Sequence, residues 1–206
     1  MTVVSIVERE TREVARNSLF RRGATMELEM LEGDDLFVIH NFMSAKDCQE
    51  HIDRSEALGY ETFTIGGEVV LNYRDNSRVI VDDPALADAL WQTAAGMLPA
   101  RREGLAASGL NRRFRYYRYS GTESFKPHHD GSVRIGRSES LLTFMVYLAN
   151  VGSGGETRFY ARGLDVIHEI KPEAGKALVF NHCLLHEGVA VTDGTKYVLR
   201  TDVMYE

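Results

Sequence analysis

The 206-residue sequence contains no long apolar run. Its longest apolar stretches are Phe144–Ala149 and Ala177–Phe180, whereas a helix that spans a bilayer needs about 20 apolar residues. The N-terminal residues MTVVSIVERETREV contain no basic start followed by an apolar block, so we expect no secretory signal. The sequence therefore predicts a protein that does not associate with membranes.

Cysteine and basic residues are also scarce. Cys48 and Cys183 are the only cysteines and form no CxxC pair, which excludes a disulfide framework and favours a reducing, cytoplasmic location. With 24 Lys and Arg against 30 Asp and Glu, the formal charge is −6. Because nucleic-acid binding needs a basic face, we expect no nucleic-acid partner.

The composition is that of an ordinary globular protein, with 44% hydrophobic and 26% charged residues. The length predicts one domain with peripheral elaboration. Residues 5–22 are charged and weakly amphipathic, so we interpret residues 1–33 as an N-terminal helical arm. The domain itself is expected at residues 34–206.

Two helices are expected before the strand-rich half. Ser44 is a predicted N-cap with Asp47 three residues later, and that helix should end at Gly59. A second helix should begin at Pro84. Short strand-like runs separated by turns then follow, at 112–119, 140–149, 156–160, 165–170, 176–181 and 195–205. This order predicts a mainly β fold, a sandwich or jelly roll with the helices packed on one face.

The chemistry is concentrated around histidine. His128 and Asp130 form an HxD pair, and on an extended segment residues i and i+2 point to the same side. A histidine from a later strand would complete two histidines and a carboxylate, the facial triad of non-haem Fe(II) sites. Taken alone, the pair is more typical of a buried, hydrogen-bonded structural contact than of a metal site.

The flanking residues carry a resemblance to a known family. Tyr119 and Gly121 precede Phe125 and the HxD pair, and Thr143, Tyr147-Leu148 and the run Gly154 to Phe159 follow. The last motif is His186-x-Gly188, with Lys196 ten residues after the histidine. Over about residues 34–206 the chain resembles the prolyl 4-hydroxylase branch of the Fe(II)/2-oxoglutarate dioxygenases.

The resemblance implies a double-stranded β-helix core at about residues 112–206 and a site for Fe(II). His128, Asp130 and His186 would be the metal ligands. His182 is the rival for the last position, but the His-x-Gly motif and the ten-residue step to Lys196 both select His186.

The same resemblance implies a site for 2-oxoglutarate. Lys196 would pair with the far carboxylate of this co-substrate, and Tyr119 would support it. Thr143 and Tyr147 resemble pocket-lining positions but are equally compatible with the core. Arg200 shares a strand face with Lys196 and is a second anchor, a substrate contact or an exposed strand residue.

Three arginines are the candidates for substrate contacts. Arg115 lies four residues before Tyr119, and Arg158 lies in the GGETRF motif. Together with Arg200 they would suit an anionic group on the substrate. A solvated surface position explains Arg158 equally well.

The resemblance implies an enzyme that hydroxylates an unactivated C–H bond of a prolyl peptide, an amino acid or a related small molecule. Fe(II), 2-oxoglutarate and O2 would be required, succinate and CO2 released, and ascorbate would support activity. The alternatives are a non-catalytic jelly-roll binding or sensing module and a cupin-type metal enzyme that does not use 2-oxoglutarate. The complete triad and Lys196 count against both, and the sequence leaves the oligomeric state open.

Overall fold

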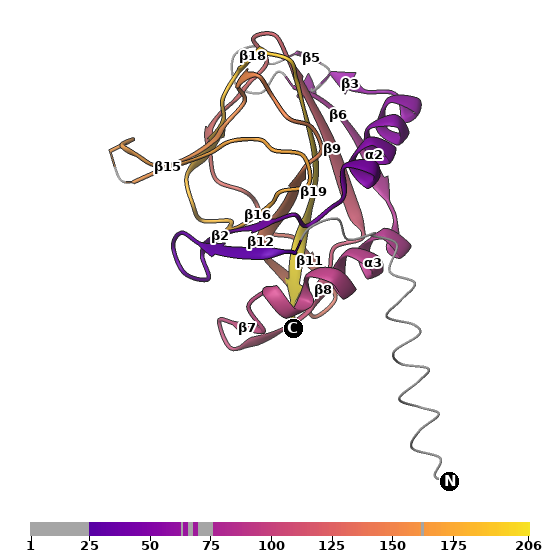
Figure 1. Ribbon diagram of the computed structural model, residues 1–206. Helices are drawn as coiled ribbons and strands as arrows, with labels where there is room; N and C mark the ends of the chain where they lie inside the picture. Colours follow the sequence, from indigo (N-terminus) through magenta and orange to yellow (C-terminus); the bar gives the residue numbers. More distant parts are fainter. Residues whose placement is uncertain (1–24, 63, 66–67, 70–75, 162) are drawn as a thin grey trace.

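The computed structural model describes residues 25–206 apart from 63, 66–67, 70–75 and 162, and within this part eleven strands form one large sheet (Figure 1). Its strand order is β1-β2-β16-β12-β19-β9-β6-β3. Off this path, β8 pairs with both β19 and β7, and β11 pairs with β12. The strands are β1 Glu27–Met30, β2 Leu36–His40, β3 Glu61–Thr62, β6 Ser77–Asp82, β7 Arg101–Arg102, β8 Leu105–Leu110, β9 Arg113–Ser120, β11 Arg134–Ile135, β12 Ser138–Tyr147, β16 Ala177–Asn181 and β19 Thr195–Tyr205.

A second, four-stranded sheet faces the large one and has the order β10-β17-β14-β15. Its strands are β10 Phe125–His128, β14 Thr157–Tyr160, β15 Val166–Ile170 and β17 His186–Gly188. Two short pairs complete the described strands: β13 Ser153–Gly154 with β18 Val191–Asp193, and β4 Thr64–Ile65 with β5 Glu68–Val69. All the pairs between named strands are antiparallel, which confirms the predicted jelly-roll class.

The central strands are buried on both faces, because alternate side chains enter two different cores. On β12, Phe144 and Val146 belong to one cluster, whereas Met145 and Tyr147 belong to the other. The first cluster lies under the helices, and the second fills the space between the two sheets. This double burial explains why β12 and β16 read as continuous apolar runs rather than as alternating strands.

Two α-helices cover the outer face of the large sheet (Figure 1): α2 Ala45–Leu58 and α3 Pro84–Ala94, the latter continued by the 3-10 helix η1 Ala95–Met97. Ser44 accepts a hydrogen bond from the Asp47 backbone N–H and caps α2, and α2 ends at Gly59, as predicted. Asp83 caps α3 ahead of Pro84.

Some details differ from the sequence-based expectations. Leu58, the apolar last residue of α2, does not pack against the core and is about half exposed. The helix expected at residues 5–22 lies outside the described residues. Residues 27–30, within the predicted arm, form β1 at the edge of the large sheet, paired with β2. Among the described residues, no helix is long and apolar enough to cross a bilayer.

We expect Gly175→Ala to destabilise the fold strongly. Gly175 has φ +85° and lies where the chain between β15 and β16 touches the segment before α2. An added Cβ would lie 2.1 Å from the Met43 carbonyl oxygen. The left-handed backbone costs about 1–2 kcal/mol and the forced backbone shift about 1–3 kcal/mol more. Urea unfolding monitored by circular dichroism measures the change.

Gly33→Ala is the matched control, since Gly33 also has positive φ (+54°) but a Cβ added there would have no neighbouring atom within 4 Å. It should lose only about 1–2 kcal/mol, the backbone cost alone. Equal losses in the two variants would show that the contact with Met43 does not constrain the fold.

Candidate metal centre and adjoining pocket

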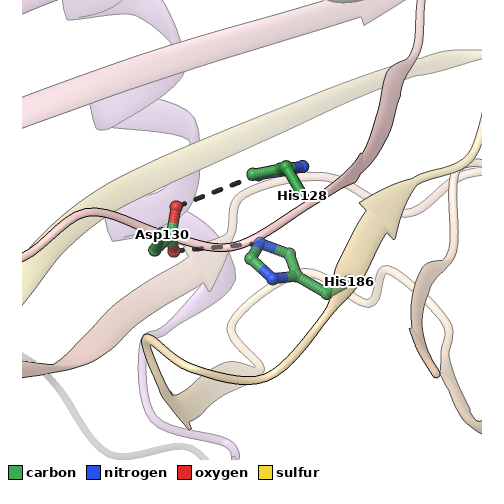
Figure 2. A group of neighbouring side chains, drawn as sticks. All are labelled: His128, Asp130 and His186. Carbon is green, nitrogen blue, oxygen red and sulfur yellow. Dashed lines mark ion pairs between the residues drawn. The ribbon is translucent and has the colours of Figure 1, made fainter. Parts of the chain in front are cut away.

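The four-stranded sheet brings two histidines to the same point. His128 is the last residue of β10 and His186 the first of β17, and the two residues are directly paired in the antiparallel register. Asp130 follows two residues after β10, where its backbone N–H donates to the His182 carbonyl at 3.1 Å. The predicted trio therefore comes together from two adjacent strands and the turn beyond them (Figure 2).

The three side chains have the spacing of a metal centre. One ligating atom from each of His128, Asp130 and His186 lies within 4.8 Å of the others. His128 Nε2 is 3.9 Å from Asp130 Oδ1, and His186 Nε2 is 3.8 Å from Asp130 Oδ2 (Figure 2). All three side chains are less than 10% exposed, so the atoms converge inside the protein rather than on its surface.

Backbone carbonyls determine the tautomer of both rings. His128 Nδ1 is 2.7 Å from the Lys126 carbonyl and His186 Nδ1 is 2.9 Å from the Leu184 carbonyl. A carbonyl only accepts, so each Nδ1 carries the proton and donates it. Each Nε2 lone pair is therefore free to bind a metal, in the arrangement that orients most metal-binding histidines.

The charge states also suit a metal. Burial, reinforced by the neighbouring His186, lowers the pKa of His128 to about 3, and burial lowers the pKa of His186. Burial alone would raise the pKa of Asp130, but the charge of Arg200 and a hydrogen bond from Thr143 outweigh it and leave the pKa low. Two neutral imidazoles and one carboxylate are the donor set of the Fe(II) facial triad, so the residues fit this metal.

A pocket of about 430 Å³ adjoins the three residues. Apolar and aromatic side chains form most of its wall, and Lys196 contributes a cation. The wall is formed by Tyr117, Tyr119, Phe125, His128, Asp130, Met145, Thr157, Phe180, His186, Glu187, Gly188, Lys196, Val198 and Arg200.

Lys196 is 2% exposed, and its ammonium lies 5.2 Å from the Tyr119 ring and 5.5 Å from the Tyr147 ring. Burial lowers its pKa to about 7, although the charge of Glu156 opposes this effect. In the described part of the chain no carboxylate forms an ion pair with Lys196. A buried ammonium that contacts only ring faces needs an anionic partner, and the pocket offers space for one.

Of the other residues predicted to bind the co-substrate, Tyr119 lines the pocket, whereas Tyr147 and Thr143 do not. Tyr147 lies behind the wall, where its hydroxyl donates to Thr157 at 2.7 Å, and Thr157 lines the pocket in its place. The Thr143 hydroxyl donates to Asp130 Oδ2 at 2.5 Å, so Thr143 supports the carboxylate rather than the pocket wall.

The three arginines do not form one cluster. Arg200 Nη2 lies 3.0 Å from Asp130 Oδ2, and the side chain is only 13% exposed, so the interpretation as an exposed strand residue was wrong. Arg115 lies 3.4 Å from Asp202, on the same side as Arg200. Arg158 is in β14 of the four-stranded sheet and forms ion pairs with Glu169 at 2.5 Å and Glu187 at 3.6 Å.

Asp202 was missed by the reasoning from sequence. It is 1% exposed and lies 3.3 Å from Arg200 and 3.7 Å from His182, the rejected rival ligand. The signal was available, because Asp202 continues the alternation of Lys196, Val198 and Arg200 on one face of β19. His182 is buried, and neither of its ring nitrogens has a hydrogen-bond partner among the described residues.

Comparison with known proteins identifies this arrangement. The family model described as the 2OG-Fe(II) oxygenase superfamily matches residues 114–201, a range that includes all three metal-site residues and Lys196. Over this core the chain is similar to the 2OG-Fe(II) oxygenase superfamily. The resemblance to the 2OG-Fe(II) oxygenases seen in the sequence is thus confirmed, together with the classification as a 2-oxoglutarate-dependent enzyme. No curated protein matches the chain.

Solved prolyl hydroxylases share the fold of this chain. A viral collagen prolyl hydroxylase from Paramecium bursaria Chlorella virus-1, solved with 2OG, is 21% identical with a TM-score of 0.62, covering 85% of this chain and 98% of its own. A Pseudomonas putida prolyl-4-hydroxylase is 18% identical with a TM-score of 0.62, covering 82% and 91%. A Trichoplax adhaerens prolyl hydroxylase, solved with a hypoxia inducible factor peptide fragment, is 15% identical with a TM-score of 0.65, covering 95% and 91%.

Replacing any one of His128, Asp130 or His186 by alanine should abolish tight binding of divalent metal while the fold persists. These side chains contribute to the site more than to either core cluster, so folding does not depend on them as it does in small zinc domains. Mn²⁺ binding by isothermal calorimetry, with circular dichroism of the same samples, checks this. His182→Ala should retain binding. The reverse pattern, with His182 required and His186 dispensable, would overturn the ligand assignment.

Lys196→Met should stabilise the metal-free protein. A pKa of about 7 in the fold, against about 10.4 when unfolded, corresponds to a penalty of at most about 5 kcal/mol below pH 7. Between the folded and the unfolded pKa of Lys196, the folded state binds fewer protons than the unfolded state. The penalty for burying the charged lysine therefore shrinks as pH rises from about 7 to about 10.4. Urea unfolding at several pH values should show the variant's advantage at pH 7 and its decline by pH 10. A variant less stable at pH 7 would contradict this.

Proposed function

We propose that the protein is an Fe(II)- and 2-oxoglutarate-dependent dioxygenase that hydroxylates an unactivated C–H bond of a prolyl peptide, an amino acid or a related small molecule. Succinate and CO2 are the products of the co-substrate. The observation that carries this proposal is the pairing of two elements in one pocket: the triad of His128, Asp130 and His186, and the buried cation of Lys196.

In this proposal the triad holds Fe(II), which together with 2-oxoglutarate and O2 supplies the oxidising chemistry. The Nδ1 bonds to backbone carbonyls keep His128 and His186 neutral and aimed, which avoids a cost of reorientation when the metal binds. Asp130 supplies the one protein anion. Three protein ligands on one side leave positions open for other groups.

Lys196 provides the partner for the far carboxylate of 2-oxoglutarate. Met145, Phe180 and Val198 are apolar parts of the wall of the pocket that this cation shares with the metal residues. In such surroundings an ion pair is stronger than in water. Pairing would also restore the full charge of Lys196, whose pKa is lowered by burial. The hydroxyls of Tyr119 and Thr157 are the adjacent hydrogen-bonding groups of the wall.

The prime substrate is proposed to approach over the wall that contains Glu187, which follows the ligand His186. Tyr160 donates to Glu187 at 2.5 Å, which holds this acceptor in place. A peptide fits the shared fold, since the Trichoplax adhaerens relative was solved with a peptide fragment. We also propose, from the sequence, a catalytic domain at residues 34–206, a cytoplasmic location and support by ascorbate.

The proposal is tested by succinate formation from 2-oxoglutarate with Fe(II), with prolyl peptides and free amino acids offered in parallel and products screened for addition of one oxygen. Lys196→Ala should raise the apparent constant for 2-oxoglutarate at least about a hundredfold, because a broken buried pair costs about 3–5 kcal/mol. Its Mn²⁺ affinity should change little. Lys196→Arg should retain part of the affinity for 2-oxoglutarate.

Lys46→Ala, at an exposed position of α2, is the matched control and should behave as the wild type. A wild-type protein that binds Mn²⁺ but never consumes 2-oxoglutarate would overturn the proposed function. Loss of 2-oxoglutarate binding in Arg200→Ala but not in Lys196→Ala would transfer the anchor to Arg200.

A further inference from the structure

Arg200 is a buried arginine whose protein contacts fall mainly on one nitrogen, Nη2, while its Nε has no hydrogen-bond partner within the described residues. Its Nη2 lies 3.0 Å from Asp130 Oδ2, 3.2 Å from the Thr143 hydroxyl and 3.3 Å from Asp202 Oδ1. Tyr117 is a further hydrogen-bond partner of its side chain. Nη2 is therefore held between two carboxylates of the protein, those of Asp130 and Asp202.

The contacts on Asp130 are unequal. Oδ2 accepts a hydrogen bond from Thr143 at 2.5 Å and lies against Arg200. Oδ1 accepts no hydrogen bond within the described residues and lies 3.9 Å from His128 Nε2, whereas Oδ2 lies 3.8 Å from His186 Nε2. One oxygen of the carboxylate is therefore restrained by the protein, and the other remains available as a ligand.

A second layer keeps Arg200 in place. Asp202 is 1% exposed and also accepts from Asn111 at 3.2 Å and from Arg115 at 3.4 Å. Arg115 and Arg200 are direct partners in the register of β9 and β19, so Asp202 lies beside two cations. Burying these charges is tolerable only because each has an opposite partner, which makes the position of Arg200 strongly determined.

We propose that Arg200 is a positioning residue for Asp130: it restrains Oδ2, so that the carboxylate offers a metal only Oδ1 and the positions needed by the co-substrate stay open. This inference rests on the proposed function. Without Arg200 the carboxylate is free to rotate and to offer both oxygens. A second oxygen on the metal would then compete with 2-oxoglutarate.

The test uses Co²⁺ as the metal probe, because its visible absorption reports the number and arrangement of its ligands. Spectra of the Co²⁺-loaded full chain are recorded without 2-oxoglutarate, and the affinity for 2-oxoglutarate is then measured by calorimetry. Arg200→Gln and Arg200→Met should both change the spectrum. They should also weaken 2-oxoglutarate binding about tenfold or more, the usual effect of losing a residue that orients a ligand. Arg200→Lys, which retains a cation and donors, should recover most of both properties.

Two further variants keep the test decisive. Arg200→Gln combined with Asp202→Asn removes one charge of each sign, so it folds where the single variant leaves two buried carboxylates together, and it should show the same altered spectrum. Arg102→Met is the control, since Arg102 is equally buried and pairs with Asp35 outside the pocket. Its spectrum should match the wild type.

An unchanged Co²⁺ spectrum in the neutral Arg200 variants would overturn the inference, even if 2-oxoglutarate binding falls, because Arg200 would then be an anchor for the co-substrate. An unchanged spectrum with only a raised KM for the prime substrate would make it a substrate contact. Failure of the wild type to bind Co²⁺ and 2-oxoglutarate would instead refute the proposed function, so the two failures are distinguishable.

Discussion

The site depends on burying charge in the apolar space between two sheets. Asp130, Lys196 and Arg200 all line the pocket in this space, whose wall also contains aromatic and aliphatic side chains. A charge there is costly unless another group compensates it. The compensation differs between the two cations: Arg200 has carboxylate partners from the protein, whereas Lys196 lies over the rings of Tyr119 and Tyr147 and has no ion-pair partner among the described residues. Lys196 is therefore the cation expected to receive an anion.

Strand β19 links these two cations. Lys196, Val198, Arg200 and Asp202 follow each other at every second position, and the first three line the pocket between the sheets. The opposite face of the same strand packs Leu199 and Val203 into the core under the helices. Because the neighbours on both sides are β9 and β12, the strand has little freedom to move, and the charges keep their spacing. A rigid strand is a better support for such a site than a loop.

Much of the fold was predictable because its signals are local. The N-cap at Ser44, the first-turn proline at residue 84 and the strand-like runs after residue 110 all depend on neighbours within a few residues. The exposed position of Leu58 was not predictable from sequence, since whether a helix end packs or protrudes depends on distant elements. The short edge strands, such as β1, have weak local patterns and exist through their pairing with β2.

For the site, the sequence by itself determined which residues have metal-ligand chemistry and which lysine lies ten residues after the second histidine. It also placed Lys196 and Arg200 on one strand face, since alternation is a local property of an extended chain. Only the tertiary structure decided what those groups contact. In the structure Arg200 pairs with Asp130 and Asp202, and Thr143 donates a hydrogen bond to Asp130. Arg158 forms a separate ion pair with Glu169. The reason is that these partners meet through strand register and the packing of one sheet on another, which no local pattern encodes.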